Sequence, residues 1–463
     1  MTLVCYSARA KLVYLKIWVT MLATAMGSFI SLRNFVFSLY AVFFITLLVL
    51  PIVPKGIALL LLLVGIVGFA VYRGKLLIGF SPEERLLIWV FSAFTFISFI
   101  SFLVFPYSRM SHYRMEDYAT FMLILPMFLL LRQWRFKLNT IVVLFSFVAT
   151  LLGVVSLLQL WSMQSGSGYF MTFDNPMAQF WNRPSGVVNP MRYAAISLIF
   201  FAFALNALVF VKRQSALIKT LLFVAMISAG IACALTQVRG AWLAFFALVF
   251  TYGCAFFYLG YRKRVVAFFA VAIIVVVSVA QFDFVEQRIH KTERAFEMYM
   301  EGNSGSSLGA RLDMFKTAWW LINERPWFGH GLNSYSANAT EIRENTPGMN
   351  PEVGRWHNPH NEILNATVEK GVIGLISMLL LFVAPGLLFL KAFLVNRGTG
   401  SVAYLSFCGI SVLIVYFVAG LSVALFEHDI FNHFYVLTVL FLASQVHSHS
   451  SCSTREERKN VEL

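Results

Sequence analysis

Residues 191–260 read MRYAAISLIFFAFALNALVFVKRQSALIKTLLFVAMISAGIACALTQVRGAWLAFFALVFTYGCAFFYLG. Three apolar stretches, 191–211, 215–236 and 241–260, follow one another with only short polar connections between them. Each has about the 20 residues that an α-helix needs to cross the hydrocarbon layer of a bilayer. The segment therefore predicts three consecutive transmembrane helices.

The same pattern recurs on both sides of this segment. Hydrophobic residues make up 59% of the chain and charged residues only 13%, whereas a soluble domain carries roughly 25% charged residues. We expect an all-α, polytopic integral membrane protein with about twelve transmembrane helices and a large helical loop before the last three. The other expected spans are 34–53, 56–73, 86–106, 116–131, 138–160, 265–283, 370–390, 402–425 and 431–447.

These spans divide the chain into five parts. Residues 1–33 form an N-terminal segment, 34–283 hold helices one to nine, 284–369 form the large loop, 370–447 hold the last three helices, and 448–463 form a tail. The N-terminal segment has basic residues ahead of a moderately apolar stretch. An interfacial or additional membrane segment fits it better than a signal peptide, because no small-residue cleavage site follows.

Lys and Arg are unequally distributed between the two sets of short connections. Together with the termini, one set holds 21 of them, and the other holds six: Lys55, Arg109, Arg114, Arg183, Arg192 and Arg239. Cytoplasmic loops are enriched in Lys and Arg. We therefore expect both termini in the cytoplasm and the 284–369 loop outside. This distribution explains the net charge of +14, so nucleic-acid binding is not expected.

Several arginines lie on the expected outside surface. Arg183 and Arg192 follow a polar, glycine- and proline-rich connection, and Arg239 lies in the short turn TQVRGA (236–241). An unpaired charge at the membrane boundary is costly, and the planar guanidinium suits a diphosphate because it donates two hydrogen bonds at once. Snorkelling to lipid phosphates or capping of a helix is the alternative for each arginine taken alone.

The large loop contains an expected amphipathic helix over 307–323, capped by Ser306 or Ser307 and stopped by Pro326. Arg311 lies at the border of its apolar stripe, at the depth of a lipid-linked phosphate. That stripe consists of Leu308, Leu312, Phe315, Trp319 and Ile322.

Two histidines, His357 and His360, precede the tenth expected span. One interpretation is a zinc site completed by His428, Asp429 or His433, since zinc normally takes at least three protein ligands. A simpler one is a histidine hydrogen-bonded at a helix start. The five cysteines lie in apolar spans or near the termini, which argues against a disulfide framework or thiolate metal site in the loop.

A family resemblance rests on three motifs between residues 236 and 374 and on the layout of twelve spans with a large loop before the last three. HNEILNATVEKGVIG (360–374) resembles the histidine motif of the O-antigen ligases within the O-antigen ligase and polymerase superfamily, with His360, Asn361, Gly371 and Gly374 at the matching positions. TQVRGAWLAF looks like the family's arginine–glycine segment around Arg239, although Gln237–Val238 stand where the family often has serine. RLDMFKTAWWLINERPWFGHGLNSY (311–335) and RPSG (183–186) are also similar to family segments.

The resemblance implies a glycosyltransferase that needs no metal or other cofactor. It would transfer a polysaccharide from undecaprenyl diphosphate, the donor, to lipid A–core, the acceptor, on the periplasmic face of the bacterial inner membrane. For this reaction we expect His360 to act as general base. We expect Arg239 and Arg311, and after them Arg183 and Arg192, to bind the diphosphate, and Asn361 to bind substrate.

Three alternatives remain. A polymerase of the same superfamily makes the same bond on another acceptor. A protein O-oligosaccharyltransferase is less favoured, because the chain ends soon after the last span. A transporter is also less favoured, since transporters tend to have charged residues near the midplane, and here the polar clusters gather at one surface.

Overall fold

The computed structural model describes residues 29–47, 52–76, 79–105, 109–165, 183–186, 189–212, 214–281, 283–396 and 400–461. These residues form helices and connecting turns, with no strand among them, so the all-α prediction is confirmed. Residues 1–28, most of the expected N-terminal segment, and 166–182, most of the polar connection before Arg183, lie outside the described residues.

Each expected span coincides with a helix or a helix pair. The fourth, 116–131, is divided into α5 (Arg109–Leu123) and α6 (Leu125–Leu131), because Pro126 cannot donate a hydrogen bond to the preceding turn. The other helices at expected spans are α2 (Phe29–Thr46), α3 (Ile52–Leu76), α4 (Pro82–Val104), α7 (Leu138–Ser165), α9 (Pro190–Phe210), α10 (Ala216–Leu235), α11 (Arg239–Tyr258), α12 (Arg262–Ala280), α16 (Glu362–Val395), α17 (Gly400–Gly420) and α18 (Asp429–Val461).

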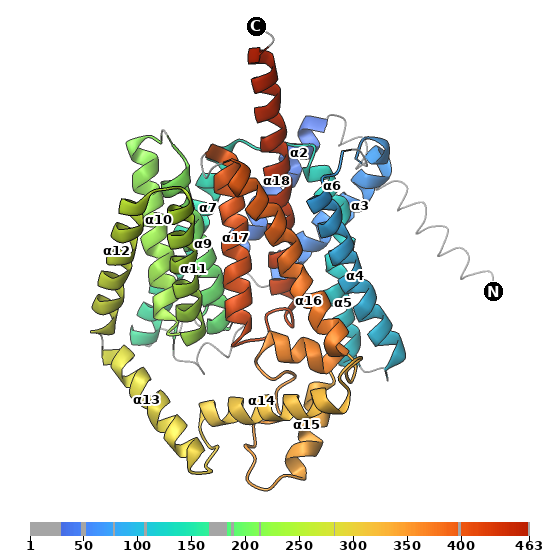
Figure 1. Ribbon diagram of the computed structural model, residues 1–463, viewed down its shortest axis with the longest axis vertical. Coiled ribbons are helices and arrows are strands. Elements are labelled where there is room, and N and C mark those ends of the chain that lie inside the picture. Colours follow the sequence, from blue (N-terminus) through green and yellow to red (C-terminus); the bar gives the residue numbers. More distant parts are fainter. Residues whose placement is uncertain are drawn as a thin grey trace, which may run out of the picture.

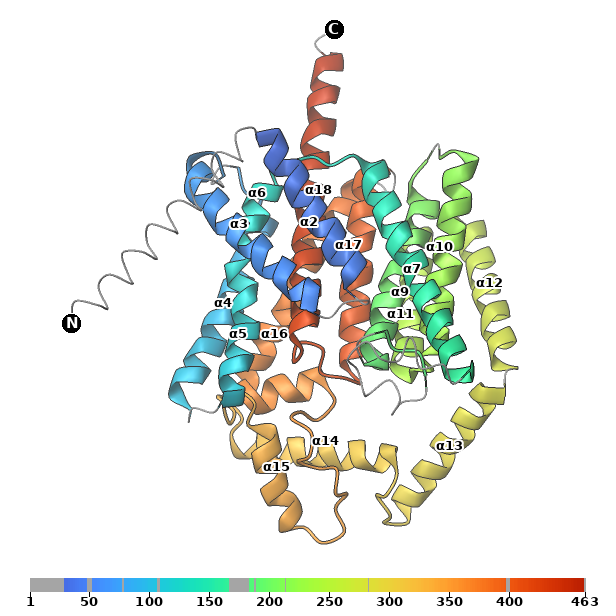
Figure 2. The same cartoon turned by 180° about the vertical axis from the view of Figure 1, so that it is seen from behind.

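Nine of the described helices are long and apolar enough to cross a membrane. The protein is therefore a multi-pass membrane protein, and the count of twelve crossings stays a prediction. α9, α17 and α18 are the most deeply buried of the nine, and the other helices surround them (Figures 1 and 2). Edge-to-face contacts of Phe44 with Phe145, Phe200 and Phe434 join α2, α7, α9 and α18 in the core.

Three helices project beyond one end of the bundle, which we call the α14 end: α13 (Asp283–Met300), α14 (Ser307–Glu324) and α15 (Tyr335–Glu344). In Figure 1, α18 extends beyond the opposite end. α16 has non-helical backbone at Gly371. Its first part lies across the α14 end, and its second part runs into the bundle (Figure 1).

The expected loop helix is present, but it packs through a different face. Ser306 caps α14 by accepting the N–H of Gly309 at 3.0 Å, as predicted. The buried face carries Met314, Ala318 and Leu321, which join a small core with α15 and the start of α16. The predicted stripe is only partly buried, and its Trp319 is 60% exposed.

Candidate active site

The predicted arginines and His360 come from separate segments that meet at the α14 end. Arg192 lies in the first turn of α9, Arg239 is the first residue of α11, and His360 directly precedes the capping residue of α16. Arg311 lies on α14. The starts of α9 and α11 lie at the α14 end of the bundle, and the first part of α16 lies across that end (Figure 1).

His360 occupies a left-handed backbone conformation with φ of 54°. The Asn358 side chain accepts its backbone N–H at 2.8 Å, and the Trp356 ring lies 5.7 Å from the imidazole. Non-glycine residues rarely adopt positive φ, and such residues are concentrated at functional sites. The surrounding turn therefore holds this histidine in a specific orientation.

The charge state of His360 is set by burial and by two neighbouring arginines. Burial, together with the positive charges of Arg311 and Arg192, lowers its pKa to about 4, against a smaller opposing effect of Glu352. An imidazole with that pKa is neutral at pH 7 and can accept a proton. The same shift indicates that both guanidinium groups lie close enough to act on the ring.

Arg192 and Arg311 are brought together by the start of α9. Asn189 caps this helix by accepting the N–H of Met191 at 2.8 Å, which fixes the first turn. The Met191 sulfur lies 3.9 Å from Nη2 of Arg311, and the next residue, Arg192, packs its guanidinium 5.7 Å from the Phe431 ring. The Nε of Arg192 is buried and has no hydrogen-bond partner among the described residues.

Arg183 and Arg239 lie beside the turn between α10 and α11. Arg183 donates to the carbonyl of Thr236 at 3.2 Å, and Arg239 donates to Oγ1 of Thr292 on α13 at 2.5 Å. Gln237, between Thr236 and Arg239 in the chain, has φ of 54°. The turn thus presents two guanidinium groups on one side of the bundle end.

A single loop separates this turn from His360. A side chain on Gly240, next to Arg239, would collide with Ser422 in the loop between α17 and α18. The neighbouring residue, Leu421, accepts a hydrogen bond from the Asn361 side chain at 3.1 Å. The α11 turn and the His360 turn therefore flank the same two residues.

Asn361 has a clear structural role. Its Oδ1 accepts the N–H of Leu364 at 3.1 Å and caps α16, while its Nδ2 makes the contact with Leu421. Both polar atoms of the amide are thus engaged within the protein. Its predicted contact with substrate stays a prediction.

The glycines of the histidine motif join α16 to the segment after α14. Gly371 has φ of 65°, and a Cβ at this position would overlap the backbone of Trp327. The break leaves the carbonyls of Val368 and Glu369 without helical partners, and these accept the N–H groups of His330 and Gly331 at 2.8 and 2.9 Å. The backbone groups freed by the break are thus satisfied by the Gly-x-Gly turn, Gly329–Gly331.

A buried ionic cluster beside this junction was not predicted. Arg114, only 4% exposed, pairs with Glu427 at 2.6 Å and with Glu369 at 3.5 Å. Glu369 also accepts the Tyr118 hydroxyl at 3.2 Å and the N–H of Asn333 at 2.9 Å. The cluster connects α5, the α14–α15 connection, α16 and the loop before α18. The one feature of the sequence that could have indicated this cluster is the acidic residue Glu369 within the histidine motif.

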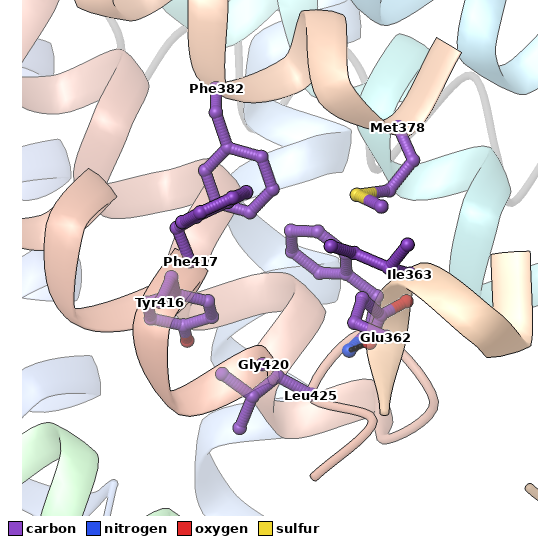
Figure 3. Close-up of a pocket in the computed structure, with 9 residues that line it drawn as sticks. Glu362, Ile363, Met378, Phe382, Tyr416, Phe417, Gly420 and Leu425 are labelled. Carbon is purple, nitrogen blue, oxygen red and sulfur yellow. Dashed lines mark hydrogen bonds between the residues drawn. The ribbon is translucent and has the colours of Figure 1, made fainter. Parts of the chain in front are cut away.

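A small crevice adjoins the first turn of α16 between that helix and α17. Glu362 lies at its edge and accepts the N–H of Phe426 at 3.0 Å. The rings of Phe382 and Phe417 and the side chains of Ile363 and Met378 close around it (Figure 3). Because the crevice is small and mainly apolar, it does not suit a sugar.

Among the described residues, no three His, Cys, Asp or Glu side chains lie close enough together to hold a metal ion. The predicted zinc site therefore has no ligand set in this part of the chain. His357 is exposed. His433 instead contacts the carbonyl of Asp429 through Nδ1 at 2.6 Å.

Comparison with known proteins gives two similarities. An uncharacterized protein of Haemophilus influenzae is 27% identical over 418 residues, covering 87% of this chain and 96% of the relative. Residues 221–379 match the family model described as O-antigen ligase, which argues against the transporter interpretation. Arg239, Arg311 and His360 lie within this matched segment, and Arg183 and Arg192 precede it.

Proposed function

We propose that the protein transfers a polysaccharide from undecaprenyl diphosphate to lipid A–core at the periplasmic face of the bacterial inner membrane. The observation that carries this proposal is the neutral His360 beside Arg192 and Arg311 at one end of a membrane bundle. The distribution of Lys and Arg along the chain supports a periplasmic location for that end.

The guanidinium groups would bind the diphosphate, which is the leaving group of the reaction. Negative charge grows on its oxygen as the bond to the sugar breaks, and fixed cations at that point lower the barrier. The buried Nε of Arg192 suits this role, because a phosphate oxygen would supply the hydrogen bond that the described residues do not. Arg239 and Arg183 form a second pair on the other side of the loop at Leu421.

His360 would accept the proton of the attacking sugar hydroxyl. The hydroxyl oxygen forms a bond to the anomeric carbon, the bond from that carbon to the diphosphate oxygen breaks, and the imidazole takes the proton. A bound diphosphate would offset the positive charge of Arg192 and Arg311. The pKa of His360 would then rise in the complex, so that the imidazole becomes a stronger base when substrate is present.

Transfer by the purified protein tests this proposal. Lipid-linked polysaccharide and lipid A–core are incubated with the wild type, His360→Ala, Arg311→Ala and the control His357→Ala, with a chelator present. We expect both site variants to lose activity by about 100-fold or more, and the exposed His357 to be dispensable. Full transfer by His360→Ala, or loss of wild-type transfer on chelation, would overturn the proposal.

A strain that lacks the gene for this protein distinguishes a ligase from a polymerase. Without a ligase, long polymer accumulates on the lipid carrier, and without a polymerase, the carrier and lipid A–core hold single repeat units. We expect the first outcome.

A further inference from the structure

A second crevice lies between α14 and α15 on the projecting part of the α14 end. Its cavity volume is about 490 Å³, which is within the size range of small-molecule sites. Its lining residues are Trp320, Leu321, Glu324, Asn338, Glu341, Ile342, Asn345 and Thr346.

The lining of this crevice is rich in hydrogen-bond acceptors. Asn338 and Asn345 direct their Nδ2 groups to the backbone carbonyls of Ser334 and Glu341, at 2.8 and 2.9 Å. Their amide oxygens and the carboxylates of the two lining glutamates are acceptors. The lining contains neither Lys nor Arg, so it disfavours phosphate and favours an uncharged ligand with many hydroxyl donors.

Trp320 supplies an aromatic wall to the same crevice. Its side chain is 37% exposed, and Nζ of Lys316 lies 5.0 Å from its ring centre. A sugar ring has a face of polarised C–H bonds, and such a face packs well on the electron-rich face of an indole. Leu321 and Ile342 are the aliphatic residues of the lining. The indole ring suits the C–H face of a pyranose, and the surrounding acceptors suit its hydroxyl groups.

We infer that this α14–α15 crevice binds an uncharged segment of a saccharide chain. Its place in the reaction rests on the proposed function: it would hold sugars of the donor polysaccharide or of the acceptor core at a distance from the bond that forms. Arg311 and Trp320 are nine residues apart on α14, which is about 14 Å along the helix. More than one sugar residue is needed to span that distance.

Binding to the full-length protein in nanodiscs tests this inference without requiring turnover. One probe is the polysaccharide released from its lipid carrier by mild acid, and the other is deacylated and dephosphorylated core oligosaccharide. We expect one of them to bind, and the one that binds identifies the source of the saccharide. Trp320→Ala should weaken this binding by about tenfold, and Glu341→Lys, which retains the indole, should also weaken it.

Trp319→Ala is the matched control, because Trp319 is the adjacent residue, is exposed and does not line the crevice. It should bind as the wild type does. Failure of both probes to bind, or equal loss in the two tryptophan variants, would overturn the inference. Either result leaves the proposed chemistry at His360 intact, whereas active transfer by His360→Ala would end that chemistry without affecting saccharide binding.

Discussion

The backbone N–H of His330 donates to the carbonyl of Val368 at 2.8 Å, at the point where α16 breaks. This contact lies directly before Gly371, whose φ of 65° redirects the helix from the end of the bundle into its interior. The histidine motif and the Gly-x-Gly turn are therefore parts of one junction.

The junction predicts that Gly371→Ala is destabilising. The new Cβ would overlap the backbone of Trp327, and alanine disfavours positive φ. We expect a melting temperature several degrees lower in detergent and a reduced yield of folded protein, both measured by fluorescence-detected size exclusion. Gly386→Ala, later in the same helix, is the control, since its Cβ would meet only a Leu413 methyl group at 3.6 Å. Equal stability of the two variants would contradict this role of Gly371.

The buried cluster predicts that neutralising Glu369 is costly. Glu369→Gln leaves Arg114 with one carboxylate, Glu427, and replaces an acceptor of the Tyr118 hydroxyl with an amide. We expect unfolding to become easier by about 2 kcal/mol or more. Thermal unfolding measures this, with Arg355→Gln as control, because the pair of Arg355 with Glu352 is solvent-exposed and should contribute little. A Glu369→Gln variant as stable as the control would disprove the expectation.

Much of this architecture follows from local sequence. The apolar lengths that predict α9, α10 and α11 depend only on the thickness of a bilayer, and the motif around His360 identified the residue that the structure places beside Arg311. The Arg114–Glu427 pair joins residues 313 positions apart. Neither hydrophobic periodicity nor loop composition can predict a contact between residues so far apart in the chain. From the sequence alone, Arg114 was counted only as a charge in a short loop.

The packed face of α14 could not be predicted for a different reason. The helix has apolar residues on more than one side, and the stripe through Phe315 and Trp319 is as regular as the one through Met314 and Ala318. Only the position of α15 and the start of α16 determines that the second stripe is buried.

The lowered pKa of His360 predicts two different acid limits of activity. A general base must be neutral, so activity falls as the pH drops through its pKa. In the free protein that pKa is about 4, and kcat/KM should decline only near that pH. In the substrate complex the diphosphate raises the pKa, so the decline of kcat should occur at higher pH. Initial rates across pH 3.5–8 measure both limits, and a kcat/KM limit near 6.5, the ordinary value for histidine, would contradict the effect of burial and arginine.

Removal of the Arg311 charge should raise the pKa of His360. Arg311 is the largest charge contribution to the lowered value, so Arg311→Gln moves the pKa back toward the ordinary range. Histidine-selective ¹⁵N NMR of the substrate-free protein reports this titration, with the signal assigned by its absence in His360→Ala. Lys316→Gln is the control on the same helix, since Lys316 is exposed and packs on Trp320. An unchanged pKa in Arg311→Gln would show that the two groups do not interact.

Thr292 on α13 is predicted to position Arg239. Its Oγ1 accepts a hydrogen bond from Nη1 of Arg239 at 2.5 Å, so Thr292→Val removes the acceptor while retaining the shape of the side chain. We expect kcat to fall by about tenfold because small displacements of a charge-stabilising group are costly, with the melting temperature unchanged. Thr292→Ser should restore the rate, because it restores the hydroxyl. Kinetics of the three proteins at saturating donor make the comparison. If the valine and serine variants have the same kcat, the Thr292 hydroxyl does not position Arg239.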